Sequence, residues 1–259
     1  MKKFATILLL NLGIIGGMTN IAQGENAATA PEELTQVVAG IEEAANKKDI
    51  EGVINYYSQD FKNSDGLTTA TLEKALTQMW QNYSQLKYTT EIQSWSESGN
   101  ELIAETLTTV KGIQTKAGRQ AQLNSTIRSR QYFQGQKLVR QEILTEESQL
   151  TSGANPPQVQ VVAPDTVTTG EKYNFDLIVD EPLGDQVLLG AVQEEKTAAN
   201  LYLNATSLEL EPLAAGGVYK VATAPTLPQS NWLSAILVRG DGITMITHRI
   251  NIKEKQAKQ

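Results

Sequence analysis

Few residues in this chain are equipped for acid–base or nucleophilic chemistry. There is no cysteine and there is one histidine, His248. A thiolate nucleophile and a cysteine-based metal site are therefore excluded, and a catalytic triad or histidine metal site would have to be built around His248 alone. His248 lies in an alternating run that predicts an exposed or edge position in the last strand. The sequence predicts no metal site and no cofactor, because it shows neither a ligand cluster nor a glycine-rich phosphate loop.

Two acids remain as weak candidates for a general base, Asp60 and Asp65. Both lie near the loop between the second and third expected helices, where a carboxylate beside a cavity would be able to take a proton. The alternative is structural. Asp65-Gly66, for example, is a strong turn pair.

A group of apolar and aromatic residues is expected to face the interior of the first half of the chain. They are candidates for lining a pocket, with filling of the core as the alternative. The group is Tyr57, Leu76, Met79, Trp80 and Tyr83.

Two arginines share one face of a predicted strand, Arg128 and Arg130. Alternation places them on the outer face, where Glu91, Glu105 and Glu142 are able to lie opposite them on neighbouring strands. One interpretation is a solvated ladder of salt bridges. The other is an interface through which two copies of the first domain's sheet pair as a homodimer.

Helical periodicity dominates residues 29–83. Apolar residues from Leu34 to Ala45 recur at helical spacing, with Thr29 and Glu32 as an expected capping box. Asp49 is expected to cap a second, short helix. The third helix, Leu72 to Tyr83, has the cleanest amphipathic stripe.

The period then changes to that of strands. Four are expected, at 86–95, 102–111, 122–133 and 137–146, separated by turn residues such as Gly99, Gly118 and Gly135. Short connections predict an antiparallel meander. Helices followed by a curled sheet predict the α+β class.

The run Ala45 to Phe61 carries a resemblance to a known family. Its small-residue helix, the Asn46-Lys47-Lys48-Asp49 step and the closing Tyr57-Ser58-Gln59-Asp60-Phe61 resemble the opening of nuclear transport factor 2-like domains, the group that includes ketosteroid isomerase and SnoaL-type cyclases. The resemblance covers about 120 residues and implies a cone, in which a bent sheet wraps over three helices around a pocket. It also implies that Asp60-Phe61 ends a helix, which is the structural alternative for Asp60. It implies no single function, because this fold hosts enzymes and non-enzymatic domains alike.

The second half reads as strands throughout. A Pro-Pro linker at 151–157 separates a first domain, 25–150, from a second, 158–259. Seven or eight short strands predict an immunoglobulin-like β-sandwich. The expected strands are 159–163, 173–179, 186–194, 201–203, 207–210, 218–223, 232–238 and 243–252, with turns at 182–185, 216–217 and 240–242.

The first 24 residues predict a signal peptide. Lys2 and Lys3 precede an apolar run, Phe4 to Met18, that is short for a membrane span, which needs about 20 residues. Ala22-Gln23-Gly24 then predicts cleavage before Glu25, with Ala27 or Ala28 as a second possibility. We therefore expect a periplasmic or secreted protein, with an uncleaved membrane anchor as the alternative.

The acidic composition, with 22 basic and 29 acidic residues and a net charge of −7, argues against nucleic acid as a partner. We expect a non-enzymatic binding or scaffolding protein of the cell envelope, with an envelope protein or a small apolar ligand as partner. The competing hypothesis is a small-molecule isomerase, dehydratase or cyclase acting in the first domain's cavity.

Overall fold

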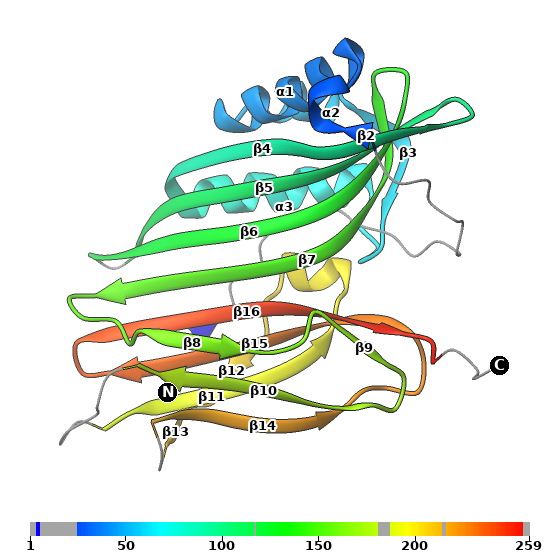
Figure 1. Ribbon diagram of the computed structural model, residues 1–259. Helices are drawn as coiled ribbons and strands as arrows, with labels where there is room; N and C mark the ends of the chain where they lie inside the picture. The colour runs from blue at the N-terminus through cyan, green and yellow to red at the C-terminus, as the bar shows by residue number, and fades with distance from the viewer. Residues whose placement is uncertain (1–3, 6–24, 117, 181–186, 214–215, 256–259) are drawn as a thin grey trace.

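The computed structural model describes residues 4–5, 25–116, 118–180, 187–213 and 216–255 (Figure 1). Its helices are α1 (Glu32–Asn46), α2 (Ile50–Ile54) and α3 (Thr69–Asn82), with the 3-10 turns η1 (Ala27–Thr29) and η2 (Ala199–Tyr202). The strands are β1 (Phe4–Ala5), β2 (Glu25–Asn26), β3 (Tyr57–Asn63), β4 (Tyr83–Ser98), β5 (Glu101–Lys116), β6 (Arg119–Gln134), β7 (Lys137–Gly153), β8 (Val159–Val162), β9 (Thr166–Thr168), β10 (Lys172–Val179), β11 (Leu189–Lys196), β12 (Ser207–Leu208), β13 (Glu211–Pro212), β14 (Gly217–Thr223), β15 (Gln229–Arg239) and β16 (Gly242–Lys253). None of the helices in these ranges is long and apolar enough to cross a membrane.

One large sheet runs through nearly the whole protein. It has eleven strands, and its main path is β13-β11-β15-β16-β7-β6-β5-β4-β2, with antiparallel neighbours throughout. Off this path, β3 pairs in parallel with β7, and β9 pairs in parallel with β16. A smaller sheet has the order β14-β10-β8, and β1 pairs with β12.

Strand β7 joins the two parts of the large sheet. One edge of β7 pairs with β6. Along its other edge, residues Leu138–Gln141 pair with β3, and residues Glu147–Gly153 pair with β16. The sheet therefore forks over residues 142–146. We call residues 25–150 the helical part and residues 151–255 the sandwich part.

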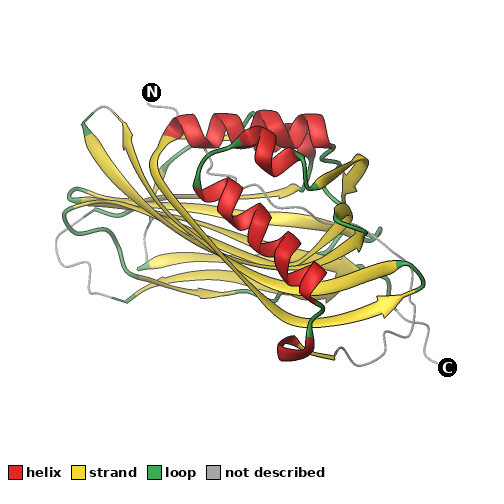
Figure 2. Cartoon of the chain, turned by 90° about the horizontal axis from the view of Figure 1, so that it is seen from above, coloured by secondary structure: helices red, strands yellow, loops and turns green. Residues whose placement is uncertain are grey.

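The two faces of the large sheet are covered by different layers. Met245 on β16 shares a core with Leu150 and with Met79 of α3, so this is the helix side. Its neighbour Ile246 packs with Phe175 of β10, so the smaller sheet covers the opposite face. Figure 2 shows the helices lying on one side of the strands, with α3 crossing them obliquely.

The helix starts follow local hydrogen bonds. Asp49 Oδ1 accepts from Gly52 N at 2.9 Å, which confirms the predicted cap of α2. The capping box predicted at Thr29 is wrong, because α1 begins after Pro31 and the Thr29 hydroxyl donates to Asn26 O. A capping box is found instead at α3, between Thr68 and Thr71.

The predicted fold class is wrong, and with it the resemblance to nuclear transport factor 2-like domains. Strands make up 59% of the structure and helices 18%, and the described residues contain three α-helices. The protein is therefore predominantly β. It is neither an α+β cone nor a cone followed by a separate immunoglobulin-like sandwich, because one antiparallel sheet continues from β4 to β11.

The physical reason lies in two places. The stretch Tyr57 to Phe61, interpreted as the end of a helix, is strand β3 and pairs with β7. Alternation also says which face a residue occupies but not which strand lies beside it. The sequence pattern therefore gave no sign that β16 pairs with β7.

Individual strands agree better with the sequence. The four predicted strands of the meander are found as β4 to β7, each longer than expected, and Gly99, Gly118 and Gly135 have positive φ at their turns. Residues 201–203 were expected as a strand, but they lie at the end of η2 and just beyond it. The turn expected at 182–185 lies outside the described residues.

The predicted leader falls mostly outside the described part of the chain, which holds only Phe4 and Ala5 of residues 1–24. The domain ranges stay a prediction. Residues 151–153 of the expected linker form the end of β7, where Gly153 pairs with Gly242.

Candidate functional site

A cavity of about 90 Å³ lies between the helices and the inner face of β4 to β7. Apart from Glu42, its helix side is apolar, and its sheet side carries hydroxyl and amide groups. The lining residues are Val38, Ile41, Glu42, Ala45, Val53, Tyr57, Leu72, Leu76, Tyr88, Thr90, Thr108, Val110, Ile127, Gln131 and Gln141.

Two carboxamides form the polar floor of this cavity. Gln131 on β6 stands directly opposite Gln141 on β7. Gln141 Nε2 donates to Ser129 Oγ at 2.8 Å, whereas its Oε1 is buried and has no hydrogen-bond partner among the residues described. A buried carbonyl oxygen without a donor is costly, so a ligand or water with an N–H or O–H group fits this position.

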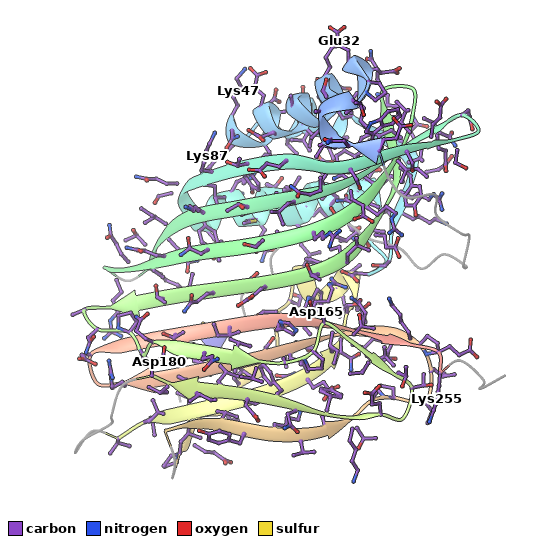
Figure 3. The ribbon with its side chains drawn as sticks, in the orientation of Figure 1. Glu32, Lys47, Lys87, Asp165, Asp180 and Lys255 are labelled. Carbon is purple, nitrogen blue, oxygen red and sulfur yellow. The ribbon has the colours of Figure 1, made fainter. Side chains whose placement is uncertain are left out.

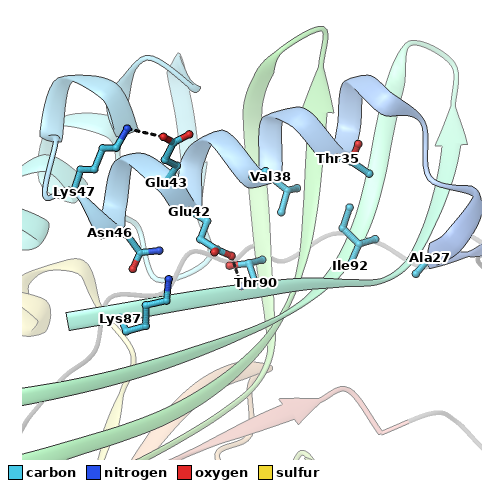
Figure 4. Close-up of a pocket in the computed structure, with 11 residues that line it drawn as sticks. Ala27, Thr35, Val38, Glu42, Glu43, Asn46, Lys47, Lys87, Thr90 and Ile92 are labelled. Atoms are coloured by element: carbon cyan, nitrogen blue, oxygen red, sulfur yellow. Dashed lines mark hydrogen bonds and ion pairs between the residues drawn. The ribbon is translucent and has the colours of Figure 1, made fainter.

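A groove of about 560 Å³ lies outside the cavity, between α1 and the edge of β4 (Figure 4). Val38, Glu42 and Thr90 line both spaces and form the wall between them. Glu42 Oε2 accepts from Thr90 N at 2.7 Å. One side chain therefore holds the wall closed by a charge-assisted hydrogen bond.

The edge of β4 along this groove is covered by side chains of α1. The Asn46 amide donates to Tyr88 O at 3.0 Å and accepts from Tyr88 N at 2.9 Å. Together with Glu42, Asn46 satisfies backbone N–H and C=O groups of β4 that would otherwise be open to pairing with another strand.

Charged residues gather at one end of the groove. Glu43 and Lys47 pair at 2.5 Å, and both are exposed. Lys87 lines the same end (Figure 3), and it has no ion pair in the described structure. The groove therefore presents a free ammonium group within reach of a polar ligand.

A cluster of buried charges fills the fork of the large sheet. Arg249 on β16 forms two bonds with Asp65, at 2.7 and 3.1 Å, and a third with Glu146 on β7 at 3.0 Å. All three side chains are fully buried. Trp232 Nε1 donates to Glu146 at 2.9 Å, and the Tyr202 hydroxyl donates to Asp65 at 2.5 Å.

The pKa values of the two carboxyl groups in this cluster are shifted in opposite directions. Burial raises the pKa of Asp65, but the Arg249 charge and the hydrogen bonds from Arg249 and Tyr202 outweigh burial and hold its pKa below the usual value. Burial raises the pKa of Glu146 above its usual value, because Arg249 and Trp232 offset only part of that penalty. Glu146 Oε1 is also buried without a partner among the residues described.

The two candidate bases therefore lie away from the cavity. Asp60 is exposed on β3, and Asp65 is sealed against Arg249. Neither is among the residues that line the cavity or the groove.

The five predicted pocket residues are all buried, but they divide between two surroundings. Tyr57 and Leu76 line the cavity. Trp80 packs in the same core and donates from Nε1 to the Tyr88 hydroxyl at 3.1 Å. Met79 and Tyr83 belong to a neighbouring core that they share with β16.

Arg128 and Arg130 belong to a ladder of ion pairs on the outer face. Glu105 bonds Arg128 at 2.7 Å and Arg130 at 2.6 Å, and Glu142 bonds Arg130 at 3.1 Å. Their charges are compensated within the chain, and the homodimer through this face stays a prediction.

His248 is buried, so the expectation of an exposed or edge histidine is wrong. β16 lies between β15 and β7, and the chain near Pro164 covers the ring. The imidazole lies 3.3 Å from Pro164 O and 3.5 Å from an Asp165 oxygen. No group of three or more histidine, cysteine or acidic residues suited to a metal ion occurs within the described ranges.

Sequence reasoning missed the residues that matter most here. The sequence singled out none of Gln131, Gln141, Glu146 and Arg249, which all fall within expected strands. The composition of β16 gave no signal that Arg249 is buried, because five of its twelve residues are large and apolar and six are polar or charged.

Residues 154–253 match a family model described as a domain of unknown function, DUF8623. Among solved structures, the chain is similar to one titled "Structure of Bdellovibrio bacteriovorus Bd1075", with 18% identity and a TM-score of 0.32. That match covers 43% of this chain and 39% of the other. No curated protein matches the chain significantly.

Proposed function

We propose that the protein is an exported, non-enzymatic binding protein of the cell envelope and that its helical part takes a small, mainly apolar ligand. The observation that carries this proposal is the cavity with the unpartnered Gln141 Oε1 on its floor. The apolar body of the ligand lies against the helices, and a hydroxyl or amide group donates to Gln141.

The size of the two spaces limits the ligand. An engineered apolar cavity of about 150 Å³ holds benzene, so about 90 Å³ accepts only a few heavy atoms. A larger ligand reaches past Glu42 into the groove, whose volume of about 560 Å³ is in the range of small-molecule sites. A polar end there meets Asn46 and Lys87.

The placement of the acids supports binding over catalysis. A general base must come within hydrogen-bond reach of its substrate. Asp65 is held by Arg249 and Tyr202, Asp60 points to solvent, and the acid that lines the cavity, Glu42, is bonded to Thr90 N.

Export rests on the leader alone. Sequencing the N-terminus of the protein recovered from its own cells should give Glu25 or a residue a few positions away. Recovery of Met1 on a membrane-bound form would contradict the localisation.

A matched pair of α1 variants tests the binding site. Val38 and Val37 are both buried, but Val38 lines the cavity and the groove, whereas Val37 lines neither. Val38→Met is expected to fill the shared wall and remove the small-molecule adduct seen by native mass spectrometry, and Val37→Met is expected to keep it. Overpacking costs both about 1–3 kcal/mol, so stability serves as the control.

Two results would contradict this function. One is the lack of any adduct on the wild-type protein purified from its native envelope. The other is a conversion of the bound molecule that Asp60→Asn or Asp65→Asn abolishes while the fold is retained.

A further inference from the structure

The exposed apolar side chains gather in one part of the molecule. Five large hydrophobic residues are exposed in the described structure, and all lie in the sandwich part: Val162, Val187, Tyr219, Val221 and Leu227. Three of them, Val162, Tyr219 and Val221, belong to the smaller sheet. Figure 1 shows β10 and β14 of this sheet on the side farthest from α1.

These three residues share the outer face of the smaller sheet. Phe175 and Leu177 of β10 point inward to the core, so Asn174 and Asp176 point outward. The register places Tyr219 and Val162 on either side of Asp176, and Val221 beside Asn174. The face is thus an apolar surface crossed by a polar central strand.

The central strand of this face carries two opposite charges without partners. Lys172 and Asp176 point outward from β10, and neither forms an ion pair in the described part of the chain. They are four residues apart, or about 13 Å along a strand, which is too far for them to pair with each other. Asn174 lies midway between them.

We propose that this outer face docks against the same face of a second copy of the chain. With the two β10 strands antiparallel and the two-fold axis at Asn174, each Lys172 meets Asp176 of the second copy. The same rotation places Val221 against its own copy. One operation therefore covers Val221 and pairs both charges, as a self-complementary two-fold interface requires.

The size of the face predicts a weak dimer. β10 and β14 are eight and seven residues long and β8 is four, so three strands spaced by about 4.8 Å cover at most roughly 14 by 23 Å. This area is below the roughly 800 Å² per partner that stable interfaces bury. Association should therefore depend on protein concentration in the micromolar range and weaken with salt, because two exposed ion pairs contribute to it.

Other faces do not offer the same match. On the outer face of β5 to β7, Glu105 and Glu142 already compensate Arg128 and Arg130. That face therefore gives a control substitution, Arg128→Glu, which is expected to leave the association unchanged.

Sedimentation velocity tests the proposal on the protein expressed with its own signal peptide and purified after export. The protein concentration is varied from about 1 µM to about 500 µM. The wild-type mass should rise toward twice the monomer mass with concentration. Val221→Glu should abolish this rise, whereas Leu227→Glu should not, although both native side chains are 72% exposed. Near-ultraviolet circular dichroism checks that each variant is folded.

Exchanging the charges of Lys172 and Asp176 tests the antiparallel arrangement of the two β10 strands. Lys172→Glu alone should leave the protein monomeric, and Lys172→Glu combined with Asp176→Lys should restore association. A wild-type protein that stays monomeric throughout, equal loss in Leu227→Glu, loss in Arg128→Glu, or no rescue by the double exchange would each overturn the proposal.

Discussion

The helical part and the sandwich part use opposite faces of the same sheet. In the helical part, three cylindrical helices cover the sheet and leave a cavity above Gln131 and Gln141. In the sandwich part, a second sheet covers it, and Phe175, Leu237 and Ile250 interlock in an apolar core. The layer packed on the sheet, rather than the sheet itself, therefore decides where a cavity remains.

The two parts also differ in what they show to solvent. The outer face of the helical part carries paired charges such as Arg130 and Glu105. The outer face of the sandwich part carries Tyr219 and Val221. We therefore propose small-molecule binding for the helical part and protein contact for the sandwich part.

Cutting the chain between the two parts gives the largest expected effect. Fragments 25–150 and 157–259 should each unfold cooperatively, because each has its own hydrophobic core. Each should be less stable than the whole chain by at least about 3–5 kcal/mol, since the cut separates Arg249 from Asp65 and Glu146. Urea unfolding of both fragments and of the intact protein measures this difference.

The same experiment has a built-in control. Mixing the fragments should recover part of the lost stability, because the pairing of β7 with β16 and the ion pairs form again. If either fragment is disordered alone while the whole chain is folded, the predicted domain boundary is wrong.

The next largest effect is expected in the core beneath the helices. Trp80→Ala removes a buried indole that packs in this core and bonds the Tyr88 hydroxyl. It should lower the free energy of unfolding by about 3–5 kcal/mol. Trp95→Ala is the matched control, because Trp95 is only half-buried, and it should cost about 1 kcal/mol. Equal losses in the two variants would show that Trp80 has no special place in the core.

Much of the secondary structure was predictable from local pattern. The stripe of the third helix and the alternation of the four meander strands each specify an element within about 15 residues. Gly99 and Gly135 mark their turns because their φ is positive. The pairing of β7 with β16 was not predictable, because it joins residues nearly 100 positions apart and depends on register rather than on period.

The site was predictable only in part, for a similar reason. Leu76 follows from the helical spacing of α3, whereas Tyr57 lines the cavity from strand β3 rather than from the expected second helix. The turn at Gly135 alone would place Gln131 opposite Arg140, but a bulge between Tyr132 and Phe133 shifts the ladder and brings Gln141 there. Asp65 meets Arg249 across 184 positions of sequence, which no local pattern encodes.

Asp65 and Glu146 of the buried charge cluster should contribute to stability with opposite pH dependence. The pKa of Asp65 is lowered in the folded protein, so its contribution is present above its unfolded value of about 3.9 and is lost as pH falls through the folded pKa. The pKa of Glu146 is raised, so its contribution is present below about 4.3 and is lost as pH rises through the folded pKa.

Thermal unfolding between about pH 3 and pH 8 tests these signs. Asp65→Asn should reduce the loss of stability as pH falls. Glu146→Gln should reduce the loss of stability as pH rises. Each variant is the control for the other. A Glu146→Gln protein that loses the acid-side dependence instead would show that the two assignments are reversed.

The smallest expected effect concerns the connection between α1 and α2. Lys48 has a φ of 55°, which costs a non-glycine residue about 1–2 kcal/mol. Its ammonium group donates to Trp80 O at 3.1 Å and to Tyr83 O at 2.7 Å, so it caps the C-terminal end of α3. The cap explains why a lysine, rather than a glycine, is compatible with this position.

Two substitutions at Lys48 distinguish the cost of its positive φ from the stabilisation that its ammonium group gives to the end of α3. Lys48→Met keeps the strained backbone and loses the cap, so it should lower the free energy of unfolding by about 1 kcal/mol. Lys48→Gly loses the cap but relieves the strain, so it should remain within about 0.5 kcal/mol of the wild type. Chemical denaturation of both variants measures the difference. If Lys48→Gly is the less stable of the two, the left-handed backbone is not strained there and the cap alone accounts for the lysine.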